Sequence, residues 1–356
     1  MTWLVEPEEP RRTNDLPPWT DVADLATIAL TLLAFDVYLA PVRIPAIGLM
    51  LRDGTRPLGL AVAVAIARHY FVPAPSLFSR IRDAWGRAHA AWPAVTTAVP
   101  LAVVVRLVVL AIGYLAVVTV GFRGEPPANS AINPWWDLPQ RWDAGWYVGI
   151  AHEGYEWTGN VADQQNLNFF PAYPMLVRAI AFLVHTHGIP RGVVIAWTAT
   201  LVSIAAFAAA AVYIYRIAAD QFGDEVATGS VLLIATYPFA VFYSAVYSEA
   251  LYLLCAAGAW YHFEKEQPVP LACWGVVAGL CRPNGALLAA PLLVWALVER
   301  RREWWPYLGA LTPILGTLIY SAWAYALTGH PFVWAELQRS AWLRTYEGPE
   351  KTIWEP

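Results

Sequence analysis

The sequence predicts an all-α polytopic membrane protein, and three observations support this prediction. Of the 356 residues, 58% are hydrophobic and only 14% are charged, which lies well outside the composition of soluble domains. The apolar residues form continuous runs rich in Ala, Leu and Val, as membrane-spanning helices require. The chain also contains 19 Trp and 28 Pro, which are typical of interfacial anchors and of helices that start, stop or bend at prolines.

The N-terminal region divides into two parts. Residues 1–22 are polar and rich in proline and lack the apolar core of a signal peptide, so we expect a disordered cytoplasmic tail. Residues 23–90 form an N-terminal hydrophobic extension. Its two apolar runs, Asp24–Ala40 and Leu58–Val72, are near the lower limit of roughly 20 residues for crossing a membrane. They form either a hairpin of short spans or elements that lie partly in the interface.

A basic segment predicts the orientation of the chain. Arg80, Arg82 and Arg87 directly precede the strong apolar run Ala91–Phe122. Because basic segments remain on the cytoplasmic side, this helix should run outward and deliver the following loop, residues 122–189, to the extracytoplasmic face.

Arg106 lies inside this outward-running helix. An arginine within a membrane span is a candidate for a functional site. Its position near the cytoplasmic end favours the simpler interpretation, in which the side chain snorkels to the interface.

The short apolar run Phe169–Val184 decides on which side every later loop lies. If this run crossed the membrane, Arg300–Arg302 would lie outside, against the positive-inside rule. We therefore predict that it lies on the membrane or dips into it. The membrane module then covers residues 91–356, and its later spans are predicted to be Pro190–Ala218, Val226–Ser244, Ala250–Phe263, Leu271–Leu280, Ala286–Val298 and Trp305–Leu327.

The longest polar interruption of the module lies at residues 134–178. Its acids, bases and amides alternate with Trp and Tyr, whose rings favour the headgroup level of a bilayer. The predicted topology brings three further polar segments to the same face: Tyr247–Glu249, Arg282–Gly285 and residues 328–356. The sequence therefore predicts a site on this loop, at the boundary of lipid and water.

Asp143 is the candidate catalytic residue of this loop. It begins a helix-like segment that should end at Gly154 with a left-handed cap, and it shares a helix face with Tyr147 at i, i+4. One interpretation is that Asp143 caps the helix N-terminus. The other is that its carboxylate acts as a general base, which its position between Arg141 and a cluster of tryptophans favours.

Other acidic and basic residues of the loop are weaker candidates. His152 and Glu153 point away from Asp143, because they lie nine and ten residues further along a helix. Asp137 is either a second carboxylate of the site or a metal ligand together with Asp143. Two acids are not a specific signal for a divalent metal, so we assign neither a metal nor a cofactor.

Arginines complete the set of candidate binding residues. Their guanidinium groups are forked donors suited to phosphate, although each could instead pair with a loop carboxylate or a lipid headgroup. Glu249 could pair with Arg282 and shape the site. The candidate substrate-binding residues are Arg141, Trp142, Tyr147, His152, Glu153, Arg178, Glu249 and Arg282. The three cysteines, Cys255, Cys273 and Cys281, lie in apolar runs and are expected to be buried and inert.

These segments resemble a known family. RWDAGWYVGIAHEGY, NFFPAYPMLVR, YSEALY and GLCRPNGALL are similar in order and spacing to the glycosylphosphatidylinositol mannosyltransferase II (PIG-V-like) family and its prokaryotic relatives. That family belongs to the GT-C membrane glycosyltransferases. The resemblance covers residues 91–344 and implies a GT-C type helical bundle, whose large extracytoplasmic first loop carries interfacial helices.

The resemblance also implies an activity. The family transfers a hexose, typically mannose, with inversion from a polyprenyl-phosphate donor to a hydroxyl of a lipid or glycan at the extracytoplasmic face. The loop aspartate of the family falls on Asp143, which would deprotonate the acceptor hydroxyl. Arg141, Arg178 or Arg282 would compensate the charge that develops on the donor phosphate, and the prenyl chain would lie between helices.

The chain is then expected to be an integral, multi-pass protein of a prokaryotic plasma membrane, with its active site on the extracytoplasmic side. A partner subunit stays open. No nucleic acid is expected, because the net charge of −4 is small and the basic residues are scattered.

Two other functions stay open. A transporter or flippase of lipid-linked sugar would also be polytopic, with Asp36 and Arg106 in the membrane. Transporters commonly contain internal repeats with paired broken helices, and the sequence contains no such repeat. A catalytically silent scaffold that binds lipid-linked sugar for a partner is the third interpretation. Only an enzyme would lose turnover in an Asp143→Asn variant that still binds the donor.

Overall fold

The computed structural model describes residues 16–343, with gaps at residues 40–41, 45–48, 52, 74, 123, 126 and 185–187. Residues 1–15 of the predicted tail, residues 344–356 and the Asp36 side chain lie outside the described residues. The contacts of the chain divide it into two compact units, residues 1–93 and residues 94–356. The regular elements of the described residues are all helices, apart from one small two-stranded ribbon.

The first unit consists of three helices and the ribbon. Its elements are α1 (Trp19–Leu39), β1 (Val42–Ile44), β2 (Leu49–Leu51), α2 (Thr55–Phe71) and α3 (Leu77–Ala91). α1 and α2 lie side by side as a hairpin, and the antiparallel ribbon joins them with Val42 opposite Leu51. The predicted tail therefore ends earlier than residue 22, because α1 begins at Trp19.

Buried charges fix the helices of this unit to one another. Asp24 of α1 is 6% exposed and Arg68 of α2 is 1% exposed, and the Arg68 Nε lies 2.8 Å from the Asp24 Oδ1. Arg80 of α3 pairs with both Asp21 and Asp24. The two acids at the start of α1, Asp21 and Asp24, are thus neutralised within the unit.

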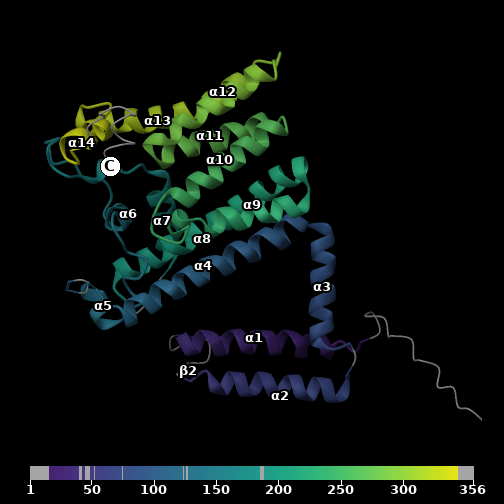
Figure 1. The fold of residues 1–356 in the computed structure, drawn as a ribbon. Helices are drawn as coiled ribbons and strands as arrows, with labels where there is room; N and C mark the ends of the chain where they lie inside the picture. The colour runs from purple at the N-terminus through teal and green to yellow at the C-terminus, as the bar shows by residue number, and fades with distance from the viewer. Residues whose placement is uncertain are drawn as a thin grey trace, which may run out of the picture. The chain divides into compact units, whose positions relative to one another are not determined.

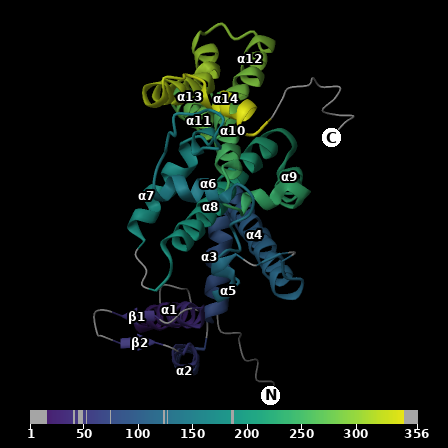
Figure 2. The same cartoon turned by 90° about the vertical axis from the view of Figure 1, so that its left-hand side faces the viewer.

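The second unit is a bundle of roughly parallel helices stacked in chain order (Figure 1). Its elements are α4 (Pro93–Thr119), α5 (Ala128–Ile132), α6 (Ala144–His152), η3 (Asn166–Asn168), α7 (Ala172–Leu183), α8 (Arg191–Phe222), α9 (Asp224–Thr236), η4 (Pro238–Tyr243), α10 (Glu249–Glu264), α11 (Pro268–Cys281), η5 (Pro283–Leu288), α12 (Ala289–Val298), α13 (Trp305–Thr328) and α14 (Val333–Ser340). The short helices α6 and α7 pack on α8, and Figure 2 shows them beside it.

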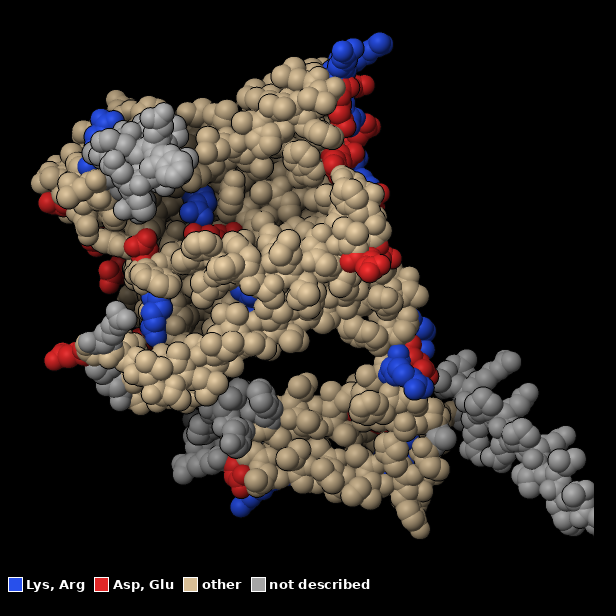
Figure 3. Space-filling view, viewed as in Figure 1, with Lys and Arg blue, Asp and Glu red and all other residues tan. Residues whose placement is uncertain are grey.

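Three helices of the described chain are long and apolar enough to cross a membrane: α4, α8 and α13. α8 is the central helix, because 78% of its most apolar window is buried, against 11% for α4. α4 therefore leaves most of its apolar surface for lipid. In Figure 3, the acidic and basic side chains of this bundle gather mainly toward its two ends, with a broad uncharged region between them. These features confirm the prediction of an all-α polytopic membrane protein.

The predicted span Val226–Ser244 is wrong. Val226–Ser244 is not a continuous helix, because α9 ends at Thr236 and the 3-10 turn η4 follows. Pro238 has no N–H to donate and forces the preceding residue out of the helical region. Tyr237 accordingly takes an extended conformation, with φ −64° and ψ 156°.

The break after α9 also explains Arg106, for which the snorkelling interpretation is wrong. The Arg106 side chain is fully buried (0% exposed) and donates hydrogen bonds to the backbone carbonyls of Ala235 and Ala240. Its guanidinium also lies 5.1 Å from the centre of the Phe207 ring. Arg106 thus donates to one carbonyl at the C-terminal end of α9, which lacks a helical partner, and to one carbonyl of η4, and so holds the two segments together.

Replacing Arg106 with Met should destabilise the bundle by about 2–5 kcal/mol, because two buried carbonyl groups lose their donor. The measurement is the thermal midpoint of the purified protein in detergent, followed by fluorescence-detected size exclusion. The matched control is Arg216→Met, since Arg216 is exposed and lies over the Tyr261 ring at 5.9 Å. Equal midpoints for the two variants would contradict the structural role of Arg106.

α11 and α13 approach each other closely through glycine. A Cβ on Gly279 would lie 2.0 Å from the carbonyl oxygen of Pro313, and one on Gly316 would lie 2.1 Å from that of Val276. Small residues allow such close backbone packing between membrane helices. This contact fixes the end of α11, from which the chain enters the site.

The cysteines do not share one environment. Cys255 and Cys281 are buried, whereas Cys273 is exposed. The expectation that all three are buried is therefore wrong for Cys273. The reason is helical periodicity, because α11 buries the face that carries Leu271 and Gly275, and Cys273 lies between them on the opposite side.

Candidate active site

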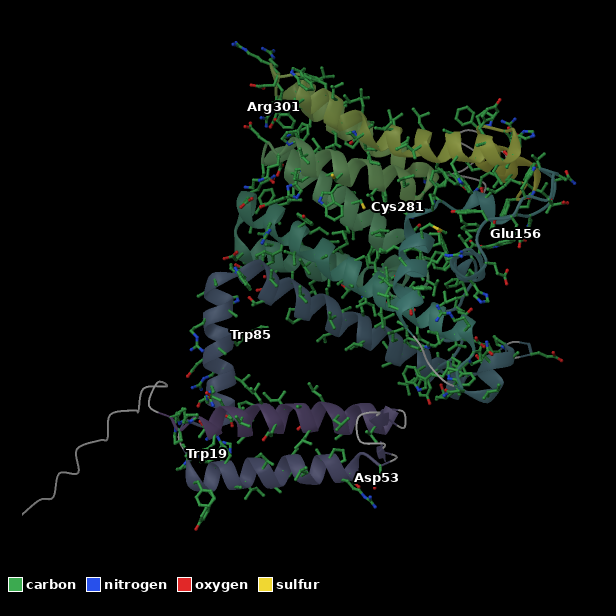
Figure 4. All side chains as sticks on the ribbon, turned by 180° about the vertical axis from the view of Figure 1, so that it is seen from behind. Trp19, Asp53, Trp85, Glu156, Cys281 and Arg301 are labelled. Atoms are coloured by element: carbon green, nitrogen blue, oxygen red, sulfur yellow. The ribbon has the colours of Figure 1, made fainter. Side chains whose placement is uncertain are left out.

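A pocket of about 420 Å³ lies at one end of the bundle. Five separate segments form its walls: the start of α6, the turn from η3 to α7, the residues before α10, the residues after α11, and α14 with Trp342. Figure 4 shows Cys281, which lines this pocket, between Arg301 at one end of the bundle and Glu156 of the long loop at the other. Four of the residues proposed from the sequence meet here: Asp143, Tyr147, Glu249 and Arg282.

Asp143 precedes α6 without capping it. The residue occupies the N-cap position with φ −76° and ψ 1°, and its side chain makes no capping hydrogen bond. The capping interpretation is therefore wrong. Within the described chain, no hydrogen bond or ion pair engages the Asp143 carboxylate, which lines the pocket together with Tyr147 one turn later. α6 ends at His152, and Gly154, two residues later, has a positive φ of +103°, as expected for the glycine that follows the helix.

The backbone before Asp143 is held in a strained conformation. Trp142 has φ +49°, a value that a bulky residue rarely adopts. Tyr247 fixes this turn from the far side of the site. The Asp143 N–H donates to the Tyr247 hydroxyl at 2.8 Å, and that hydroxyl donates to the Arg141 carbonyl at 3.2 Å. Burial raises the pKa of Tyr247 to about 12, so the hydroxyl keeps its proton and remains a donor at neutral pH.

The two residues after Tyr247 contact two other segments of the site. The Ser248 hydroxyl lies 3.2 Å from the Tyr147 hydroxyl, whose pKa burial raises. Glu249 pairs with Arg282, with 3.0 Å between the Oε1 and Nη1 atoms. This ion pair confirms the pairing predicted from the sequence. Tyr247–Glu249 therefore connects the loop, α6 and the end of α11.

Three acceptor atoms around the pocket are buried and have no hydrogen-bond partner among the described residues. They are the Asn168 Oδ1, the Glu249 Oε2 and the Gln338 Oε1. Sequence reasoning missed Asn168, Gln338 and the aromatic residues Trp334 and Trp342 that line the same pocket. The signal for α14 was present, because Trp334, Gln338 and Trp342 are spaced four residues apart.

Arg141 and Trp142 lie on a second, mostly apolar pocket of about 380 Å³. This pocket runs along one side of α4 and reaches Val241–Ala245. The Arg141 Nη1 donates to the carbonyls of Asp137 and Gln140 at 2.6 and 2.8 Å. Its guanidinium is thus partly engaged by the backbone of its own loop.

Three further candidates lie outside the first pocket. The Arg178 Nη1 donates to the Ile150 carbonyl at 3.5 Å and so lies at the C-terminal end of α6. His152 and Glu153 are exposed and face each other at 3.6 Å. The structure therefore separates these three residues from Asp143.

Asp137 has a structural role in the loop. Its buried carboxylate accepts hydrogen bonds from the Ser130 N–H at 2.7 Å and from the side-chain amides of Asn129 and Gln140, each at 3.1 Å. Asp137 also does not line the pocket that Asp143 lines. Within the described residues, no group of three or more His, Cys, Asp or Glu residues could hold a metal ion.

Comparison with known proteins confirms the resemblance found in the sequence. Residues 127–301 match the family model described as Mannosyltransferase (PIG-V). The chain is also similar to GPI mannosyltransferase 2 of Drosophila pseudoobscura pseudoobscura, with 27% identity over 141 residues. This alignment spans 36% of the chain but only 30% of that relative. No solved structure matches the chain.

Proposed function

We propose that this chain, whose residues 127–301 match the PIG-V mannosyltransferase family, is a membrane glycosyltransferase of the GT-C type. It transfers a hexose, which we propose is mannose, from a polyprenyl-phosphate donor to a hydroxyl of a lipid or glycan acceptor. One observation carries the proposal. A carboxylate without a capping bond, Asp143, faces the same pocket as Arg282, whose forked guanidinium suits a phosphate.

The proposed reaction is a single inverting displacement. Asp143 removes the proton of the acceptor hydroxyl as the oxygen attacks the anomeric carbon of the hexose. The bond from this carbon to the phosphate oxygen breaks, and its electron pair leaves with the polyprenyl phosphate. Arg282 stabilises the negative charge that develops there, and its pairing with Glu249 holds the guanidinium in place.

The second pocket supports a lipid-linked donor. Its walls are mostly apolar, and it begins at Arg141 and Trp142, directly before Asp143 in the chain. It runs along α4, whose surface is largely unburied and fits lipid. We propose that the prenyl chain lies in this groove.

The distribution of arginine supports an extracytoplasmic site. Arg301 lies at the end of the bundle opposite to Glu156, which belongs to the loop that carries the site (Figure 4). Basic residues favour the cytoplasmic side. We therefore propose that loop 122–189 lies on the outer, extracytoplasmic side of the membrane.

The test is a transfer assay. Membranes that contain the protein are incubated with polyprenyl-phosphate-linked radiolabelled mannose and a native lipid extract, and the products are separated by chromatography. Label in a new product that control membranes do not form would support the transferase. Absence of transfer, with intact protein and an extract that serves a control enzyme, would overturn it. A transporter or flippase would instead move the label across vesicles and leave the donor unchanged.

Tyr247→Phe should lower kcat about 10-fold while the protein stays folded. The variant loses the hydroxyl that bonds the Asp143 N–H and the Arg141 carbonyl, and one such bond contributes about 1 kcal/mol. The strained turn at Trp142 then no longer holds Asp143 in one position. The measurement is kcat and KM in the transfer assay. Tyr252→Phe is the matched control, because Tyr252 does not line the pocket, and equal effects of both substitutions would argue against the positioning role.

A further inference from the structure

The wall formed by α14 comes from outside the segment that matches the family. The match ends at residue 301, whereas α14 is Val333–Ser340. Trp334, Gln338 and Trp342 recur every four residues and all line the first pocket. The other face of α14 buries Val333 and Leu337. One stripe of α14, with Val333 and Leu337, thus anchors the helix, and the neighbouring stripe, with Trp334 and Gln338, lines the pocket.

Several contacts fix α14 in this position. Val333 and Leu337 pack with Leu167 of η3 in a small apolar cluster. The Trp334 indole N–H donates to the Ser321 hydroxyl at 3.1 Å. The Ser340 hydroxyl donates to the Val161 carbonyl of the long loop at 2.5 Å. The wall is therefore held by both α13 and the loop.

Three acceptor atoms on this side of the pocket have no hydrogen-bond partner among the described residues. The Gln338 Oε1, the Asn168 Oδ1 and the Glu249 Oε2 are acceptors, and each is buried without a partner in the described chain. Asn168 is only 6% exposed. Buried acceptors are nearly always paired in folded proteins, so these three atoms indicate a ligand that brings several donors. A phosphate offers only acceptors to these three atoms, whereas the hydroxyl groups of a sugar can donate to all three and can also accept from the side-chain amides of Asn168 and Gln338.

We propose that α14, together with Asn168 and the free oxygen of Glu249, recognises the hexose of the donor. This inference rests on the proposed function. The ring hydroxyls donate to Gln338, Asn168 and Glu249, and the apolar face of the sugar packs against the indole rings of Trp334 or Trp342. The phosphate then lies toward Arg282. The preference for one hexose is assigned to a helix beyond the segment that matches the family.

The test uses equilibrium binding and requires no turnover. The purified full-length chain in nanodiscs is titrated with radiolabelled polyprenyl-phosphate-mannose and, separately, with polyprenyl phosphate that carries no sugar. The wild type should bind the mannosylated ligand at least about 10-fold more tightly. Gln338→Leu should remove most of this difference by weakening only the mannosylated ligand, whereas Gln338→Glu, which keeps acceptor oxygens, should retain more of it.

The matched control is Arg339→Gln, which changes the next residue of α14 but lies outside the pocket, and it should bind both ligands as the wild type does. Equal binding of the two ligands by the wild type would overturn the inference, as would equal weakening of both ligands by Gln338→Leu. These outcomes are distinct from failure of the proposed function, which is a lack of product in the transfer assay. If the protein prefers the mannosylated ligand but forms no product, the result supports hexose recognition by α14 and contradicts the proposed transferase activity.

Discussion

Asp143→Asn should lower the rate of mannosyl transfer by about 10³-fold, within the range of about 10²–10⁴ that a general base contributes. Asn has nearly the same shape as Asp but does not accept a proton at neutral pH. The folded structure should persist, because the Asp143 side chain makes no capping bond that the substitution could remove. Turnover should therefore fall while the affinity for the donor stays close to that of the wild type. The measurement is kcat in the transfer assay, with donor binding in nanodiscs alongside.

Glu153→Gln is the matched control for this substitution. Glu153 is a carboxylate at the other end of α6, is exposed, and lies outside the pocket. It should retain near wild-type turnover. Equal transfer by the wild type and Asp143→Asn would exclude Asp143 as the base. Loss of donor binding together with turnover in Asp143→Asn would point to a binding role instead.

Arg282→Met should lower kcat by about 10²–10³-fold, comparable to the loss of one preorganised donor at a site where charge develops. The reason is that Arg282 is the arginine that lines the pocket with Asp143. Arg282→Lys keeps the positive charge but loses the forked geometry, so its rate should lie between those of the wild type and the Met variant. The measurement is kcat and KM for the polyprenyl-phosphate donor.

Arg178→Lys provides the comparison for Arg282→Lys. Both arginines suit a phosphate by sequence, yet Arg178 lies at the end of α6 and donates to the Ile150 carbonyl. Arg178→Lys should therefore keep most of the activity. If Arg178→Lys lowered the activity more than Arg282→Lys, the donor phosphate would not lie at Arg282. Combining Arg282→Met with Glu249→Gln then measures the coupling of the ion pair, because independent residues would give additive losses.

The contribution of the sequence differs between the elements of this chain. Composition predicted the membrane class, and the apolar runs predicted α8 and α13 nearly to their ends. Both properties are local, since the length of an apolar run and the period of a helix depend on neighbouring residues alone. The same local reasoning misplaced the end of α9. The composition of residues 226–244 is apolar throughout, and only Pro238 marks the break.

Arg106 and Asp143 show where local reasoning stops. The sequence placed Arg106 in a membrane helix, but its partners lie about 130 residues further along the chain. Nothing near Arg106 in the sequence distinguishes a snorkelling side chain from one that pairs with carbonyls. Asp143 stands at a helix N-terminus in both interpretations, and only the structure shows that it does not cap the helix.

The sequence by itself indicated the class of the protein, the loop that lines the pocket and the shared face of Asp143 and Tyr147, and it offered Arg282 as a partner of Glu249. The sequence placed residues 328–356 on the same face, but only the tertiary structure shows which arginine lies in the pocket and that α14 forms part of its wall. The physical reason is sequence separation. A pocket wall built from five segments depends on how helices pack, and packing follows from the shapes of side chains across the whole bundle, which no single stretch of sequence contains.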